Sequence, residues 1–236
     1  MGANESAIRE RQMTLNRNRR LIYAFLSRLY EKEVTVELLK ELSSEDSSIL
    51  QIADLMELDD DGFRKGFEML SRYLRSVSGR DLKEVKLELA VEYANLFLGV
   101  KGKPSHPSES VYRSEDQTLY QEPRDKVLRA YWNAGVDKVK EYTEPEDHIA
   151  IELQFMEYLC RKTVEALEKN EKEEANRCLQ VQKEFIDDHL SSWVPRLTKD
   201  ISEGTEVDFY KGIAYITNAF VELERNSIRV LIEQTN

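Results

Sequence analysis

Residues 143–167 read TEPEDHIAIELQFMEYLCRKTVEAL, and this stretch decides the fold class. Thr143 is followed three residues later by Glu146, with Pro145 between them, which is the form of a capping box at the start of a helix. An apolar stripe then recurs every three or four residues, at Ile149, Leu153, Met156, Cys160, Val164 and Leu167. The stretch therefore predicts a long central helix with one face in the core.

The same helical spacing continues on both sides of this stretch. No sustained segment alternates with the period of two that a half-buried strand requires. The spacing predicts helices over residues 14–32, 36–42, 47–58 and 60–77. It also predicts a helix that starts at Asp81 and has an apolar face formed by Leu82, Val85, Leu89, Tyr93, Leu96 and Val100. A further helix carries Leu179, Phe185 and Ile186. The last predicted helix starts at Thr205 and Asp208, and its apolar face is formed by Phe209, Ile213, Ile216, Phe220 and Leu223.

Composition agrees with this helical pattern. The 236 residues include 9 Gly and 5 Pro, too few for the many short connections of an all-β protein, and 33% of the residues are charged, which suits long solvated helix faces. No stretch rich in Gly, Ser or Pro divides the chain. We therefore predict an all-α protein in which residues 1–236 form a single compact helical domain.

An irregular segment from about residue 99 to residue 122 separates two predicted helices. It contains Gly99, Gly102, Pro104 and Pro107. A segment of this length is uncommon as an idle connection, which makes it a candidate binding loop or hinge, with a disordered linker as the alternative. Its apolar and aromatic residues favour docking on the core over disorder: Val111, Tyr112, Leu119 and Tyr120.

Charge and cysteine content restrict the partners and the compartment. With 45 acidic and 34 basic residues the net charge is -11, which disfavours nucleic acid and would attract a basic peptide, although solubility explains the charge equally well. Cys160 and Cys178 form no C-x-x-C pair, so we expect reduced thiols and a cytoplasmic protein. No apolar run approaches a membrane span, and the Arg19-Arg20 pair lies in an amphipathic helical pattern rather than in an export signal.

Motifs of catalysis are missing from the sequence. No histidine stands three residues after a glutamate, as paired-helix metal sites require, and no nucleophile elbow occurs. Residues 99–105 resemble a phosphate-binding loop in composition but lack its spacing. We expect neither an enzyme nor a metal or cofactor site, and His148 is better interpreted as a structural residue of the helix start.

The acid-rich start of the central helix is the remaining candidate site. Glu144, Glu146 and Asp147 could hold arginine side chains, because carboxylates bind guanidinium groups bidentately. The simpler interpretation is that these acids complement the positive end of the helix dipole. The residues alone favour the simpler interpretation.

Three ordered motifs resemble the TorD family of redox-enzyme maturation chaperones. Residues 144–156 are similar to the family signature Glu-Pro-x-Asp-His-x-x-x-Glu-Leu-x-Phe-Met, residues 107–112 to Pro-Tyr-x-Ser-Val-Tyr, and residues 189–195 to His-Leu-x-x-Trp-x-Pro. Ser108 stands where the family usually has an aromatic residue. The matched region covers roughly residues 90–200, and the helical pattern extends the likeness to the whole chain.

The resemblance implies a cytoplasmic, non-enzymatic chaperone. Such a protein binds the twin-arginine signal peptide of a molybdenum-cofactor oxidoreductase and holds the apo precursor until the cofactor is inserted and export can proceed. The implied peptide-binding residues are Asp147, His148, Glu144, Ser110, Val111 and Tyr112. Asp147 would receive arginine and Tyr112 would line an apolar groove, whereas Trp193 and Pro195 are expected to be packing residues. The expected oligomeric state is a monomer or a domain-swapped homodimer, and the alternative function is a generic helical adaptor for another basic or amphipathic peptide.

Overall fold

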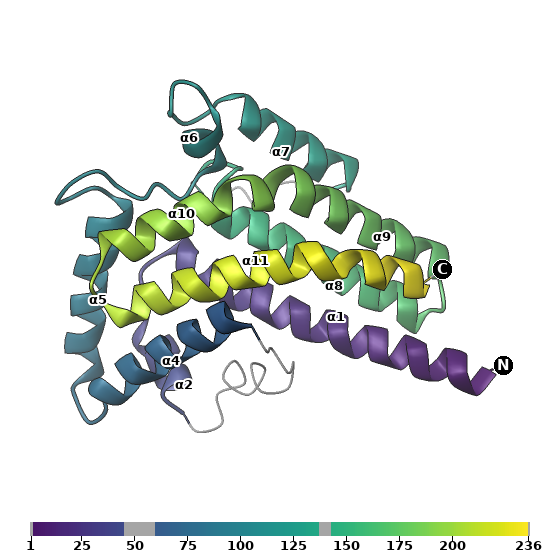
Figure 1. The fold of residues 1–236 in the computed structure, drawn as a ribbon, viewed down its shortest axis with the longest axis horizontal. Helices are drawn as coiled ribbons and strands as arrows, with labels where there is room; N and C mark the ends of the chain where they lie inside the picture. Colours follow the sequence, from purple (N-terminus) through teal and green to yellow (C-terminus); the bar gives the residue numbers. More distant parts are fainter. Residues whose placement is uncertain (1, 45–59, 137–142, 236) are drawn as a thin grey trace.

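Residues 2–44, 60–136 and 143–235 are described by the computed structural model, so the helix predicted over residues 47–58 lies outside the described part. Every regular element in these residues is a helix (Figure 1). In chain order they are α1 (Gly2–Glu31), α2 (Val36–Leu42), α4 (Asp61–Ser76), α5 (Leu82–Phe97), α6 (Glu109–Arg113), α7 (Glu122–Asn133), α8 (Ile149–Glu168), α9 (Lys172–Phe185), the π-helical turn η1 (Ile186–Leu190), α10 (Ser191–Gly204) and α11 (Asp208–Thr235). The prediction of an all-α protein is confirmed.

Helices α8 and α11 organise the packing. α1 and α9 lie along α8, while α4 and α10 lie along α11. Figure 1 shows α9, η1 and α10 as one continuous rod, with α5 at one end of the molecule and α6 and α7 along one side. One hydrophobic cluster extends from Ile22 in α1 to Ile232 in α11. This cluster supports the junction between α6 and α8 that forms the candidate site.

The first helix begins earlier than predicted. α1 starts at Gly2 instead of Thr14. Its N-terminal part is held by polar contacts, including a 2.9 Å hydrogen bond from Arg9 to the side chain of Asn170 at the turn after α8. Apolar periodicity could not show this extension, because Met13 is its only buried apolar side chain among the described residues and its other contacts are made by charged and amide groups.

The Arg19-Arg20 pair lies within α1, as an amphipathic helix requires. Arg19 is buried, and its Nε and Nη2 donate to both carboxylate oxygens of Glu224 on α11 at 2.6–3.0 Å. Tyr23 donates to the same carboxylate at 2.6 Å. Arg20 faces outward, with its Nε 3.6 Å from Glu157. The two arginines therefore point to opposite sides of the helix and are part of the fold.

The start of α8 differs from the predicted capping box. The helix begins at Ile149, and its N-cap is His148, whose Nδ1 accepts a hydrogen bond from the backbone N–H of Ala150 at 3.2 Å. The carbonyl of Pro107 accepts the N–H of Ile149 at 2.8 Å. A neighbouring loop thus satisfies a donor of the first turn of α8, and Thr143 lies before the helix. The predicted stripe from Ile149 to Leu167 is confirmed as buried.

Most other predicted helices are found where expected. Residues 36–42 and 60–77 form α2 and α4, and Thr205 precedes α11, accepting the N–H of Val207 at 3.0 Å. The predicted helix from Asp81 ends at Phe97, so Val100 is not part of its buried stripe and is 69% exposed. Gly99 adopts a φ of +71°, a left-handed conformation that turns the chain away from the helix axis.

Two further expectations concern the cysteines and the membrane. Cys160 and Cys178 are both buried and free, in agreement with the packing interpretation. In the described part of the chain, no helix combines the length and the apolar character needed to cross a bilayer.

Glycines allow α4 and α11 to approach closely. A Cβ atom on Gly66 would lie 2.8 Å from the carbonyl oxygen of Gly212 and 2.9 Å from the backbone nitrogen of Ile216. A Cβ on Gly212 would lie 2.7 Å from the carbonyl oxygen of Gly66. Backbone atoms cannot move aside as a flexible side chain can, so both positions require the absence of a side chain.

Replacing Gly66 with alanine should therefore destabilise the protein. We expect the free energy of unfolding to fall by about 1–3 kcal/mol, the usual cost of overpacking, although alanine is the better helix former. Urea denaturation followed by circular dichroism measures the change. Gly102 has open space around its Cβ position, so Gly102→Ala is the control and should be nearly neutral. A Gly66→Ala variant as stable as the control would contradict the close approach.

Candidate functional site

The site lies where the segment before α6 meets the start of α8. Ser108 and His148 form an isolated antiparallel β-bridge. The N–H of Glu109 donates to the carbonyl of Asp147 at 2.9 Å, and the N–H of Ser105 donates to the carbonyl of Leu96 at 2.7 Å. The segment predicted as a binding loop or hinge is therefore docked by backbone hydrogen bonds, and it contains a short helix.

Asp147 occupies the centre of this junction and has no exposed surface. Its Oδ2 accepts the backbone N–H of Ser110 at 2.7 Å, which joins residues 37 positions apart. Its Oδ1 is buried with no hydrogen-bond partner among the described residues. Burial raises the pKa of Asp147 above its ordinary value, and the hydrogen bonding with Ser110 opposes this rise.

His148 is held next to Asp147 as a neutral residue. Burial, together with the nearby charge of His106, lowers the pKa of His148 to about 3. An unprotonated Nδ1 is also what the N-cap hydrogen bond from Ala150 requires. The sequence left the protonation state of His148 open, and its burial makes the ring neutral at physiological pH.

The other predicted site residues have different surroundings. Glu144 precedes the junction and is exposed. Val111 and Tyr112 lie on α6 and are partly buried. The hydroxyl of Tyr112 donates to Asp200 at 3.1 Å, and its ring lies 5.6 Å from the ring of Trp193. The structure therefore brings Asp147, His148 and Ser110 together, while Tyr112 faces α10 and Glu144 lies at the surface.

The sequence analysis missed two buried carboxyl groups at the junction. Glu109 begins α6, and its Oε2 lies 2.8 Å from Nδ1 of His189 on η1, while Arg113 donates to its Oε1. Glu152 on α8 accepts the indole N–H of Trp193 at 3.1 Å. All of these residues except Arg113 are buried. A signal was present, since each buried residue stands within or beside one of the three motifs.

Trp193 is fully buried, as expected of a packing residue, although it lies inside α10 and not beyond a helix end. Pro195 lies in the same helix. Because proline has no backbone N–H, Pro195 cannot donate a hydrogen bond to the carbonyl four residues earlier. The π-helical turn η1 ends directly before α10, the helix that contains Pro195. The turn positions His189 against Glu109.

Unpartnered polar atoms are concentrated at the junction. Four buried side-chain atoms there lack a hydrogen-bond partner among the described residues: Nδ1 of His106, Oγ of Ser108, Oδ1 of Asp147 and Oε1 of Glu152. A buried polar group without a partner is costly, so such groups are rare and usually have a functional reason. The donor and acceptor set of this junction is therefore suited to a polar ligand.

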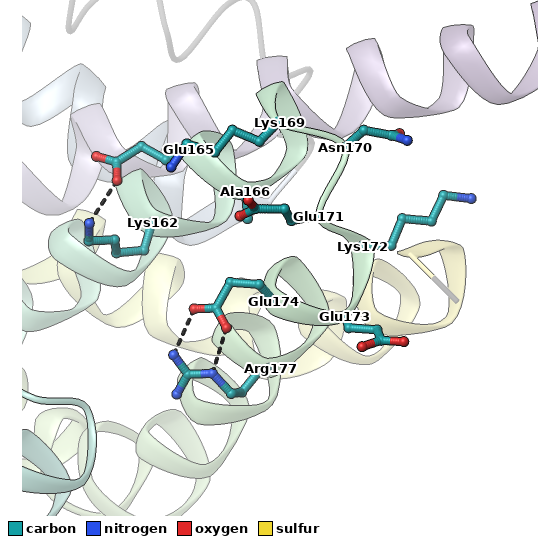
Figure 2. Close-up of a pocket in the computed structure, with 10 residues that line it drawn as sticks. All are labelled: Lys162, Glu165, Ala166, Lys169, Asn170, Glu171, Lys172, Glu173, Glu174 and Arg177. Atoms are coloured by element: carbon teal, nitrogen blue, oxygen red, sulfur yellow. Dashed lines mark hydrogen bonds and ion pairs between the residues drawn. The ribbon is translucent and has the colours of Figure 1, made fainter.

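A separate cavity lies away from the junction. It has a volume of about 890 Å³ and lies at the turn between α8 and α9, as Figure 2 shows. Its charged groups neutralise each other, since Lys162 pairs with Glu165 at 2.7 Å and Arg177 pairs with Glu174 at 2.7 Å. Among the described residues, no set of three or more His, Cys, Asp or Glu side chains is placed so that it could hold a metal ion. This cavity is at the opposite end of α8 from His148 and offers little net charge to a ligand.

Comparison with known proteins identifies the family. The family model described as nitrate reductase delta subunit matches residues 57–199, which include the whole junction. The chaperone protein TorD of Aliivibrio fischeri is 28% identical over 89% of this chain and 94% of its own length. The TorD proteins of Vibrio cholerae and Vibrio vulnificus are 29% and 30% identical over 94% and 89% of this chain, and over 97% and 94% of their own lengths.

These relatives share the designation of chaperone. Their common role confirms the prediction that the protein is not an enzyme. The family match also includes the three motifs on which the resemblance was based. The chain belongs to the nitrate reductase delta subunit family and is a TorD-family chaperone.

Proposed function

We propose that this chaperone acts in the cytoplasm and binds the twin-arginine signal peptide of a molybdoenzyme precursor. In this proposal it holds the apo oxidoreductase until the cofactor is inserted and export can proceed. It acts as a monomer or as a homodimer swapped through residues 99–122. The observation that carries the proposal is the buried, unpartnered Oδ1 of Asp147.

The chemistry of Asp147 suits an arginine. A carboxylate oxygen that lacks a partner in a low-dielectric site gains most from a charged donor, and the planar guanidinium group presents several N–H groups to it. The chain's net charge of -11 would steer a basic peptide toward the protein. Glu144 at the adjoining surface would add to the local attraction.

Access to Asp147 requires the α6 segment to move. Ser108, Glu109 and Ser110 have no exposed surface, and they lie over the start of α8. The peptide would take the place of this segment, with its apolar part beside Val111 and Tyr112. Segments that move to admit a ligand belong to the less stable parts of a fold, so we expect the α6 segment to open more readily than α8 beneath it.

Asp147→Asn should weaken binding of a synthetic twin-arginine peptide by about 10- to 100-fold, because hydrogen bonds to charged groups contribute about 1.5–3 kcal/mol. The asparagine side chain has nearly the same shape and keeps an acceptor for Ser110. Isothermal titration calorimetry measures the affinity, and circular dichroism checks that helicity is unchanged.

The matched control is Asp116→Asn, an exposed carboxylate between α6 and α7, which should bind like the parent protein. A second comparison uses the peptide with both arginines changed to alanine. If Asp147→Asn binds as tightly as the parent, Asp147 is not in the site. If the alanine peptide binds as tightly as the arginine peptide, the generic helical adaptor is the better description.

A further inference from the structure

Three carboxyl groups meet at the junction without exposed surface. Glu109 comes from α6, Asp147 from the turn before α8 and Glu152 from the first turn of α8. The bases within hydrogen-bond distance, His189 and Arg113, both contact Glu109. Asp147 and Glu152 have no basic partner within that distance among the described residues.

Glu152 has an unusual position for a carboxyl group. Its Oε2 accepts the indole N–H of Trp193 at 3.1 Å, and its Oε1 is buried and accepts no hydrogen bond from the described residues. The protonated carboxyl group is within hydrogen-bond reach of the Glu109 carboxylate, so the two acids share one proton. The titratable groups that face it are Glu109 of α6, Asp147 before α8 and Tyr131 of α7, while His189 of η1 reaches it only through Glu109. Among the described residues, none of the titratable groups that directly face Glu152 is a cation.

This environment favours the protonated form of Glu152 in the free chaperone. Burial, the charges of Glu109 and Asp147 and the hydrogen bond with Glu109 together raise the pKa of Glu152 well above its ordinary value, and the hydrogen bond from Trp193 opposes this rise. An arriving cation reverses the effect of the neighbouring charges, because an opposite charge nearby stabilises the ionised carboxylate.

We infer that Glu152 is the second carboxylate of the peptide site and that it releases a proton when paired arginines dock beside it. The inference rests on the proposed function and deepens it. Two guanidinium groups would meet two carboxylates that lack basic partners, Asp147 with Oδ1 and Glu152 with Oε1. The proton of the Glu152 carboxyl group moves to the solvent. The two positive guanidinium groups are then matched by two negative carboxylates. A single arginine would be satisfied by Asp147 alone.

Calorimetry with Glu152→Gln tests the inference. The glutamine has nearly the same shape, keeps an acceptor for Trp193 and cannot ionise. The titration uses a synthetic twin-arginine peptide and a single-arginine peptide at pH 7, each in two buffers with different ionisation enthalpies. For the parent protein, we expect the binding enthalpy of the twin-arginine peptide to depend on the buffer, with up to about one proton released.

Glu152→Gln should abolish this buffer dependence and weaken the binding of the twin-arginine peptide by about tenfold. The single-arginine peptide should bind the parent and the variant equally well. Glu168→Gln, an exposed glutamate of the same helix, is the matched control and should behave like the parent. Equal proton release and equal affinity in parent and Glu152→Gln would overturn the role of Glu152 while leaving the proposed function intact.

A measurement without peptide tests the protonation of Glu152 independently. The folded protein binds a proton at Glu152 that the unfolded chain has lost above its ordinary pKa. Stability of the parent therefore falls as pH rises through the window above that value, whereas the variant lacks this loss. We expect the free energy of unfolding of Glu152→Gln, measured by urea denaturation, to increase relative to that of the parent from pH 5 to pH 8. Parallel pH profiles would mean that Glu152 has no proton to release and would overturn the inference, whether or not the peptide binds.

Discussion

Replacing Arg19 with methionine should lower the free energy of unfolding by about 3–5 kcal/mol, the usual cost of leaving one member of a buried ion pair alone. The Arg19 guanidinium is buried between α1 and α11 and donates to both oxygens of Glu224. It also donates to Oδ1 of Asn16 at 2.7 Å. Without it, the Glu224 carboxylate remains inside the protein with no cationic partner among the described residues. Urea denaturation followed by circular dichroism measures the loss.

Two further variants separate charge from packing. The double variant Arg19→Met with Glu224→Leu should recover part of the lost stability, because an apolar pair of similar volume often replaces a buried ion pair without cost, whereas Tyr23 and Asn16 lose their hydrogen-bond partners. Arg20→Met is the matched control on the same helix. Arg20 is 40% exposed and 3.6 Å from Glu157, so the control should change stability by no more than about 0.5 kcal/mol. A double variant as unstable as Arg19→Met would contradict this explanation.

Trp193→Ala should lower the free energy of unfolding by about 3–5 kcal/mol, the range found when large buried aromatic residues are truncated. Trp193 is among the largest fully buried side chains and joins α10 to Glu152 of α8 and to Tyr112 of α6. The change removes the core volume and the donor to Glu152 together. Urea denaturation monitored by circular dichroism measures it, since tryptophan fluorescence would also be altered.

Trp193→Phe separates the two losses. It keeps most of the ring volume and removes the indole N–H, so the expected cost is about 1–3 kcal/mol for the unpaired oxygen of Glu152. The control is Trp132→Ala on α7, because Trp132 is 60% exposed and should change stability by no more than about 0.5 kcal/mol. Equal losses in Trp193→Ala and Trp132→Ala would contradict the packing role of Trp193.

The helices could be predicted from the sequence because their apolar faces repeat locally. The stripe from Ile149 to Leu167 is buried as expected, and α2 and α4 have nearly the predicted bounds. The ends of the helices were less predictable where another segment of the chain supplies the hydrogen bonds of the end. Ile149 begins α8 because the carbonyl of Pro107 accepts its N–H, and that partner is 42 positions away.

The candidate site, like the helix ends, could be predicted only in part. Its motifs named Asp147, His148 and Ser110, and the fold brings these three residues together. Neither the burial of Asp147 nor the carboxyl groups of Glu109 and Glu152 could be inferred from spacing. A charged residue in a helical pattern is usually solvated, so only the surrounding helices show that these carboxyl groups are buried.

Residue types at short spacing were sufficient to predict the helical class, the apolar faces and the family resemblance. The tertiary structure decided the partners: Arg19 with Glu224, Glu109 with His189, and Asp147 with the backbone of Ser110. These partners are between 37 and 205 positions apart. Whether a charged side chain is buried, and which group pairs with it, depends on the distant segments that pack around it. Local periodicity does not show which segments these are.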